Sequence, residues 1–196
     1  MHTSPHPLDP LLSRQSTSTL EDPAPRGADL DLILDAGLRA PDHGRLRPWR
    51  FVLIRGEARA AFSDCLAAAA RDRQAPQAQI DRIRAWPLQT PLLIGIGAQI
   101  RAGHAIPEIE QMLSAGAAAM NMLNAIHMLG YGGMWVTGAN TYDPKVNAAL
   151  GFLAPSRLVG FLAVGTPKAP TPGTTTPSGR PERLAHVVDW SGPLTA

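Results

Sequence analysis

The stretch from Arg39 to Arg55, R-A-P-D-H-G-R-L-R-P-W-R-F-V-L-I-R, carries a helix end, a polar loop and a strand in direct succession. Apolar residues at helical spacing precede it over 30–38, and Pro41 ends that helix because proline cannot continue it. Residues 41–48 are polar and cationic, as is typical of a loop. Trp49 to Arg55 is dense in aromatic and β-branched residues, which favours a strand. The stretch therefore predicts a helix followed by a cationic loop and the first clear strand.

Helical and strand patterns alternate along the rest of the chain, without internal repeats. Gly130 and Gly151 stand where the glycine that ends a helix is usually found. Because helices separate the strands, the pattern indicates a single α/β or α+β domain. The expected helices span 8–17, 57–74, about 76–86, 107–129 and 144–150, and the other expected strands span 90–98, 132–138 and 157–165.

Two apolar segments indicate where the core lies. T-P-L-L-I-G-I-G-A (90–98) is an uninterrupted apolar run, which suits a strand buried on both faces. The centre of helix 107–129, S-A-G-A-A-A-M-N-M-L-N-A-I, is apolar almost all round and rich in small residues. Such a helix is sunk in a core or crosses close to another helix. The buried face of helix 57–74 is expected to carry Phe62, Cys65, Leu66 and Ala69.

The composition excludes several classes of protein. The 196 residues suit one domain, and 44% hydrophobic against 17% charged residues allow a sizeable core. With 18 Lys and Arg against 16 Asp and Glu, the net charge of +2 does not suit a nucleic-acid binder. A single cysteine argues for a reducing compartment, and no apolar run reaches the roughly 18 residues of a membrane helix. No signal-peptide pattern is visible, so we expect a cytoplasmic protein without membrane or nucleic-acid partners.

Several familiar sites are not expected. G-I-G-A-Q-I (95–100) imitates a dinucleotide-binding fingerprint but lacks the third glycine and the helix that should follow. The six histidines show no metal-ligand spacing with acidic residues or cysteine, so no metal is expected. Cys65 lies on an apolar helical pattern, as an inert thiol would, and no serine-nucleophile motif is present. We therefore expect no catalytic nucleophile among the side chains.

Two cationic segments are candidates for binding an anion. In R-Q-S (14–16), an arginine and a hydroxyl two residues apart can hold a phosphate together, although a solvated helix end has the same pattern. In the loop 41–48, His43, Arg45 and Arg47 lead into Trp49 and could surround an anionic aromatic ligand, although a cationic surface loop is the simpler interpretation. Neither segment names its ligand by itself.

The order of these segments carries a resemblance. R-Q-S (14–16) is followed by R-A-P-D-H (39–43), P-W-R-F-V-L-I (48–54), E-x-x-x-S-A-G-A-A-A-M (110–120), G-Y-G-G-M-W-V-T-G (130–138) and V-G-F-L-A-V-G-T-P (159–167). Over roughly residues 8–168 the chain resembles the nitroreductase family of flavoenzymes. The D-H pair, in place of the usual paired serines, is similar to the short YdjA-type NAD(P)H nitroreductases of that family.

The resemblance implies an α+β fold, with a central mixed or antiparallel β-sheet flanked by helices in an intertwined homodimer. It implies FMN as cofactor and NADH or NADPH as reductant. The implied FMN contacts are Arg14, Gln15 and Ser16 at the ribityl phosphate, Arg39 and His43 at the flavin, and Trp135, Val136 and Thr137 beside the ring and phosphate. The stretch implied in nicotinamide or substrate binding is Ala125, Ile126, His127, Met128, Leu129 and Gly130.

The chain departs from the family pattern at three positions, two where an arginine is missing and one where an arginine is gained. Family members commonly carry Arg where this chain has Gln15, and often Arg where it has Val136. Arg47 stands where they have Gln. Arg45, Arg47 or Lys168 could replace the missing positive charge near the phosphate.

The chemistry implied by the resemblance is a ping-pong transfer of hydride from NAD(P)H through flavin to a nitroaromatic, quinone or similar electron-poor acceptor. A cation near flavin N1 would stabilise the reduced form, and Arg39 is the candidate. The implied flavin sites lie at the dimer interface. Residues 1–7 are expected to be a flexible leader, 8–168 the FMN domain, and 169–196 an extension that packs on the partner through Val187, Val188 and Trp190.

Three alternatives remain open at this point. One is a non-catalytic flavin-binding or redox-sensing module on the same scaffold. Another is an arginine-rich binding protein for small anionic ligands, without flavin. The third is a flavoenzyme that reduces another acceptor, such as an enone or a halogenated phenol.

Overall fold

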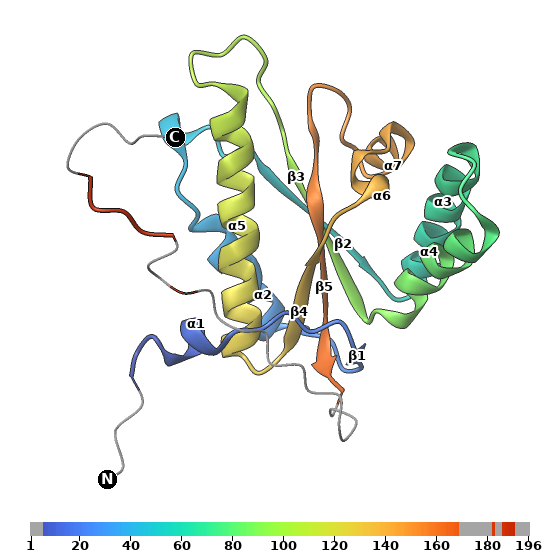
Figure 1. The fold of residues 1–196 in the computed structure, drawn as a ribbon, viewed down its shortest axis with the longest axis horizontal. Helices are drawn as coiled ribbons and strands as arrows, with labels where there is room; N and C mark the ends of the chain where they lie inside the picture. The colour runs from blue at the N-terminus through green and yellow to red at the C-terminus, as the bar shows by residue number, and fades with distance from the viewer. Residues whose placement is uncertain (1–5, 169–181, 183–185, 191–196) are drawn as a thin grey trace.

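A five-stranded antiparallel sheet forms the centre of the molecule (Figure 1). The computed structural model describes residues 6–168, 182 and 186–190. The strand order is β1-β5-β3-β2, and β4 also pairs with β5. All the strand pairs are antiparallel, so the sheet is antiparallel rather than mixed. The predicted α+β class is confirmed. The strands are β1 (Leu20–Glu21), β2 (Trp49–Arg55), β3 (Leu92–Ala98), β4 (Gly132–Val136) and β5 (Arg157–Pro167).

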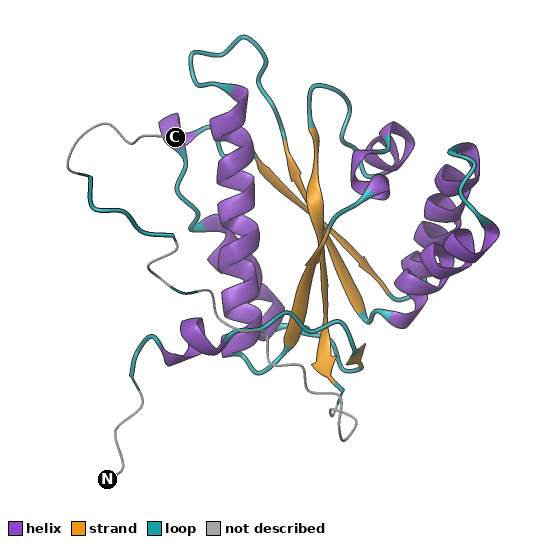
Figure 2. Ribbon diagram, viewed as in Figure 1, coloured by secondary structure: helices purple, strands orange, loops and turns teal. Residues whose placement is uncertain are grey.

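Helices cover both faces of the sheet (Figure 2). In Figure 1, α1, α2 and α5 lie on one side, and α3, α4, α6 and α7 lie on the other. The bounds are α1 (Asp9–Ser13), α2 (Ala28–Leu38), the 3-10 helix η1 (His43–Arg45), α3 (Ala58–Asp72), α4 (Gln77–Gln89), α5 (Glu108–Met128), α6 (Ala139–Tyr142) and α7 (Pro144–Ala149).

Strand β3 is buried along its whole length, as its apolar run predicts. Ile94 and Ile96 belong to the cluster beneath α2 and α5, whereas Leu93 belongs to the cluster beneath α3. Continuous burial is usually a sign of a parallel sheet. Here an antiparallel sheet shows it because helices cover both of its faces.

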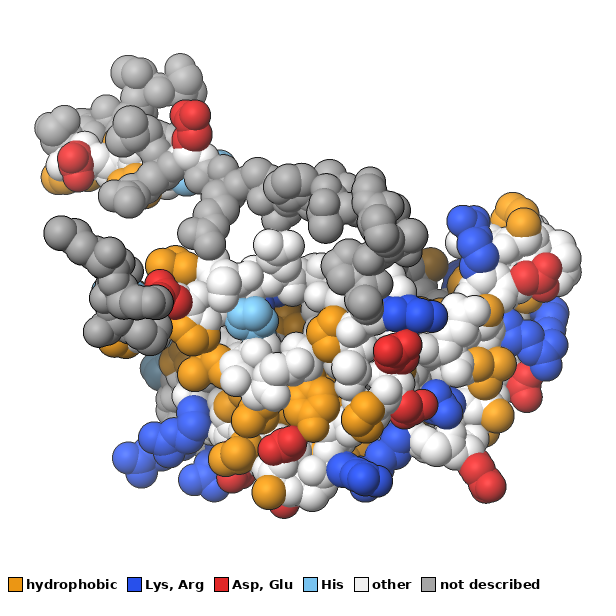
Figure 3. All heavy atoms as spheres, turned by 90° about the horizontal axis from the view of Figure 1, so that it is seen from below, with side chains coloured by type: hydrophobic (Ala, Val, Ile, Leu, Met, Phe, Trp, Pro, Cys, Tyr) orange, Lys and Arg blue, Asp and Glu red, His pale blue; other side chains and the backbone are white. Residues whose placement is uncertain are grey.

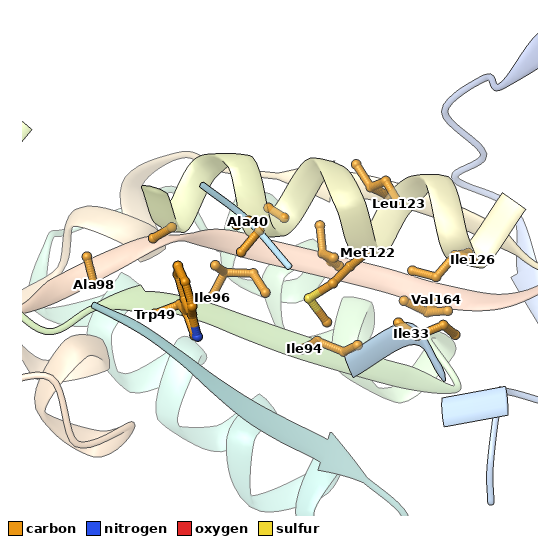
Figure 4. Packing of buried hydrophobic residues seen from close by; sticks show 14 of the residues in the cluster. Ile33, Ala40, Trp49, Ile94, Ile96, Ala98, Met122, Leu123, Ile126 and Val164 are labelled. Atoms are coloured by element: carbon orange, nitrogen blue, oxygen red, sulfur yellow. The ribbon is translucent and has the colours of Figure 1, made fainter. Parts of the chain in front are cut away.

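Helix α5 crosses close to α2, also as predicted. A Cβ atom at Gly37 of α2 would lie 2.9 Å from Cγ of Met122 on α5, so only a glycine permits this approach. Met122 is fully buried, and Figure 4 shows it among Ile33, Ile94 and other core side chains. Burial of such a side chain contributes on the order of 2 kcal/mol to stability. The packing of α5 therefore fixes where its last turn lies.

The structure corrects four local predictions. Helix α1 ends at Ser13 rather than near residue 17, because Arg14 has an extended backbone with ψ of 131°. Cys65 is half-buried rather than buried, although desolvation still raises the pKa of its thiol. Helix α4 continues past Trp86 to Gln89, with Pro87 inside it. The short elements β1, η1 and α6 were not predicted.

The predicted end segments fall mainly outside the described residues. Residues 1–5 of the expected leader and most of the expected extension 169–196 are not among them. Among the described residues of that extension, Val187, Val188 and Trp190 are exposed. No helix in the described part of the chain is long and apolar enough to cross a membrane.

Candidate functional site

A cavity of about 330 Å³ opens where the segment after α1 meets the last turn of α5. Figure 3 shows the molecule from the side at which α5 ends, with Lys and Arg side chains (blue) toward the edges of this face. Both polar and apolar side chains line the cavity. Its lining residues are Ser13, Arg14, Gln15, Thr17, Leu123, His127, Gly130, Tyr131, Gly133 and Pro167.

Hydrogen bonds fix the walls of this cavity. The Thr17 backbone N–H donates to the carbonyl of Gly133 at 3.1 Å, so the segment after Arg14 runs beside β4. Ser13 Oγ lies 3.0 Å from His127 Nε2, which connects the end of α1 to the last turn of α5. These contacts bring together residues that lie more than a hundred positions apart in the sequence.

The Tyr131 hydroxyl anchors the floor of the cavity to α2. It donates to Asp29 Oδ2 at 2.8 Å. This hydrogen bond to a carboxylate, together with burial, raises the pKa of Tyr131. This hydrogen bond therefore ties the turn after α5 to α2.

Arg14 is the main cationic group of the cavity. Its Nη1 is buried and has no hydrogen-bond partner among the residues that the structure describes. A buried N–H without an acceptor is costly, and one on a charged group is more so. An anion in the cavity would supply the acceptor, so the chemistry of the site fits a phosphate group.

The other residues of the predicted segment R-Q-S (14–16) do not all line the cavity. Gln15 lines the cavity, whereas Ser16 is exposed and is not among its lining residues; Thr17 takes that place. A hydroxyl is therefore present as expected, but on the next residue. Sequence spacing missed this because α1 ends early and the chain continues in an extended conformation.

The second predicted segment lies at the opposite end of α5. His43 Nδ1 contacts Glu110 Oε2 at 2.7 Å in the first turn of that helix. Glu110 and His127 are separated by 17 residues of α5, about 26 Å at the usual helical rise. Arg39 and His43 are both exposed. Within one chain, the structure therefore does not bring His43 together with Arg14.

The loop that carries His43 has a strained backbone. Arg45 and Arg47 have φ of 56° and 50°, in a region that residues other than glycine rarely occupy. The Arg47 backbone N–H donates to Asp42 Oδ2 at 2.7 Å, which closes the loop. Strain of this kind is concentrated at functional sites. Both arginines are far from the Arg14 cavity, so they do not supply its missing charge within the same chain.

The predicted segment Trp135 to Thr137, at the end of β4, does not lie on one face of the sheet. Trp135 packs with the cluster under α5, and its Nε1 is buried without a partner among the described residues. Val136 and Thr137 instead line a cavity of about 460 Å³ together with Trp86 of α4. The alternation of side chains along a strand separates Trp135 from Val136, and Thr137 follows the end of β4 at Val136.

A polar network that the sequence analysis missed holds the segment after β4. Asp143 is only 7% exposed, accepts hydrogen bonds from the backbone N–H groups of Lys145 and Val146, and is paired with Arg73 Nη1. Arg73 Nη2 also donates to Asn140 Oδ1 at 2.6 Å. The D-P dipeptide at 143–144 is a usual helix start, with Asp as cap and Pro in the first turn, and it could have revealed this site.

Only part of the predicted nicotinamide stretch faces a cavity. His127 and Gly130 line the Arg14 cavity, and Gly130 ends α5 with a φ of 84°. Ile126 is fully buried in the core, so its side chain contacts the sheet rather than a ligand. Met128 is exposed. A run of six consecutive helical residues cannot present all its side chains to one ligand.

The fold and the cavity together define an α+β protein with an arginine-lined cavity beside the end of a long central helix. The family model described as "Nitroreductase family" matches residues 11–166, and the chain belongs to this family of oxidoreductases. Among curated proteins, "Putative NAD(P)H nitroreductase YdjA" of Escherichia coli K12 is 42% identical over 161 residues. That match covers 82% of this chain and 88% of the relative.

Solved structures support the same fold. A nitroreductase-like family protein from Bacillus cereus matches with a TM-score of 0.80 and 23% identity, over 98% of this chain and 100% of the other. A variant of the FMN- and NADPH-dependent nitroreductase NfnB from a Sphingopyxis-type strain matches with a TM-score of 0.75 and 21% identity, over 94% and 98%. The family and the fold that the sequence motifs predict are thereby confirmed.

Proposed function

We propose that this chain is an FMN-dependent oxidoreductase that uses NADH or NADPH to reduce nitroaromatics, quinones or similar electron-poor acceptors. The observation that carries the proposal is the buried, unpartnered Arg14 Nη1 in the cavity at the end of α5. Family membership and the cofactors in the names of the relatives support FMN and NAD(P)H. We place the activity in the cytoplasm, in accord with the single cysteine.

Arg14, with Gln15 and the hydroxyl-bearing residues Ser16 and Thr17, would hold the phosphate of FMN. When bound, FMN supplies hydride transfer from NAD(P)H and onward reduction of the acceptor, in a ping-pong sequence. The protein contributes binding and orientation, and no nucleophilic side chain is needed. Of the predicted β4 segment, Trp135 on the α5 side of the sheet would lie nearest the flavin, whereas Val136 and Thr137 line the cavity beside α4. Of residues 125–130, His127 and Gly130 line the Arg14 cavity and would border the nicotinamide.

A second copy of the chain would complete the site. His43, through its contact with Glu110, lies about 26 Å from His127 along α5 by the helical rise, and so reaches a flavin in the Arg14 cavity only if a partner supplies it. Members of the family are typically dimeric. Ile109 and Leu113 near the start of α5 are each 64% exposed, as residues of an interface would be in an isolated chain. The extension 169–196 would pack on the partner.

Steady-state turnover tests the proposal. The purified chain should be yellow, or should become so with added FMN, and should consume NADH or NADPH only when an acceptor such as a nitroaromatic or quinone is present. Flavin that binds but supports no turnover with either reductant would favour the non-catalytic flavin-binding module. A colourless protein that does not bind FMN would favour an anion-binding protein and contradict the proposal.

A further inference from the structure

We propose that His127 is a second cation of the Arg14 cavity and binds the phosphate of FMN directly. The inference rests on the proposed function, because it takes the anion in this cavity to be that phosphate. It also changes the expected role of His127, from contact with the nicotinamide to recognition of the phosphate.

The lining of the cavity gives the first argument. Among its ten residues, Arg14 and His127 are the two whose side chains can carry a positive charge. Gln15 is neutral, and Arg45 and Arg47 belong to the loop at the other end of α5. A phosphate dianion carries more negative charge than one guanidinium neutralises. His127 is therefore the group within the cavity that can supply the remainder.

The hydrogen bonding of the imidazole gives the second argument. Nε2 of His127 is engaged by Ser13 Oγ at 3.0 Å, which fixes the ring at the wall of the cavity. Nδ1 makes no hydrogen bond with any residue that the structure describes. A protonated imidazole donates from both nitrogens, so the ring can hold Ser13 with one and an anion with the other.

The electrostatic surroundings give the third argument. His127 lies in the last turn of α5, where the partial negative charge of the helix end favours a cation. Charged groups on the neighbouring elements include Arg14 after α1, Asp9 on α1, Arg26 just before α2, Asp29 on α2 and Lys168 after β5. Asp29 already accepts the Tyr131 hydroxyl, and Asp9 accepts the backbone N–H of His6. A phosphate between Arg14 and His127 would carry the charge opposite to that of the guanidinium and of an imidazolium.

The test compares FMN with riboflavin, which has the same ring but no phosphate. Dissociation constants for both are measured at pH 6 and pH 8 for the native chain and for His127→Gln. At pH 6 the substitution should lower the preference for FMN over riboflavin roughly tenfold, as expected for one charge-assisted hydrogen bond. At pH 8 the difference should shrink, because histidine usually loses its charge between pH 5 and 8. The phosphate itself also titrates near pH 6, but equally with both proteins.

Two further variants separate charge from structure. Ser13→Ala removes the hydrogen bond that positions the ring but keeps the imidazole, so it should lower the preference for FMN less than His127→Gln does. Lys168→Gln removes an alternative cation, next to Pro167 of the cavity lining, and should retain the preference. The inference fails if His127→Gln keeps the native preference at pH 6, if Ser13→Ala reproduces its loss, or if Lys168→Gln alone abolishes the preference. Failure of the native chain to bind any flavin would instead contradict the proposed function.

Discussion

His43 Nδ1 lies 2.7 Å from Glu110 Oε2 in the first turn of α5, at the opposite end of that helix from the cavity of Arg14. The two groups of residues expected to bind one flavin are thus held far apart by a rigid helix. A twofold axis that passes near the middle of α5, perpendicular to the helix, would place the start of one α5 near the end of the other. The geometry of a single chain therefore supports a site shared between two.

Leu113→Glu tests the shared site. Leu113 is 64% exposed on α5, and a carboxylate there should disrupt an apolar interface. We expect a monomer by light scattering and a loss of FMN retention. Leu88→Glu is the matched control, since Leu88 is 50% exposed on α4, on the other side of the sheet. A Leu113→Glu variant that is monomeric and still retains FMN fully would contradict a shared site.

Arg14→Ala tests the phosphate role of the buried guanidinium. Loss of a charge-assisted contact should weaken FMN binding by about 10- to 100-fold, on the order of 1.5–3 kcal/mol, while riboflavin binding changes little. Fluorescence titration with both flavins measures this. Arg84→Ala, in an exposed pair with Asp64, is the control and should leave both affinities unchanged. Equal losses for FMN and riboflavin would mean that Arg14 supports the fold rather than the phosphate.

Gly160→Ala tests the position of Trp135. A Cβ at Gly160 would lie 2.2 Å from Trp135 Nε1, so the indole would have to move. We expect a loss of roughly 1–3 kcal/mol in the free energy of unfolding, to which the φ of 156° at Gly160 also contributes. A shift in tryptophan fluorescence should accompany it and report the displaced indole. Gly95→Ala on β3 is the control, since its nearest neighbour would lie at 3.6 Å. If both variants unfold at the same denaturant concentration, Trp135 does not pack as described.

Asp143→Ala tests the network behind β4. It removes both the cap of α7 and the partner of Arg73, whose side chain is only 29% exposed. Breaking a buried pair is strongly destabilising, so we expect a loss of about 3 kcal/mol in urea denaturation. Asp64→Ala removes the partner of Arg84 in a pair that is more than half exposed, and should cost less than about 1 kcal/mol. Similar losses in the two variants would contradict a strong contribution of Asp143 to the free energy of unfolding.

The sequence predicts the elements whose patterns are strong and local. Trp49–Arg55 has the predicted bounds, and 107–129 differs from α5 by one residue at each end, because proline and glycine mark their limits. The end of α1 was wrong because the leucines of that segment are about half exposed and do not extend the helix. The elements β1 and α6 are too short to have a periodic pattern.

The sequence identified several residues of the candidate site but not how they are arranged in space. Motif order identified the family and pointed to Arg14, although spacing alone could not tell that Thr17 would line the cavity in place of Ser16. The contact of Ser13 with His127 depends on tertiary packing and has no local signal. The separation of Arg14 from His43 likewise follows from the length of α5 and its orientation, which a sequence pattern does not report.

We propose that reducing equivalents pass from NAD(P)H through FMN bound at this cavity to an electron-poor acceptor. This proposal is tested most directly by following the two half-reactions of the FMN-loaded protein separately, without oxygen. NADH or NADPH alone should bleach the yellow colour in an amount equal to the bound FMN, and a nitroaromatic or quinone added afterwards should restore it. Flavin that stays yellow with both reductants, or that bleaches and is not reoxidised by any such acceptor, would contradict the claim.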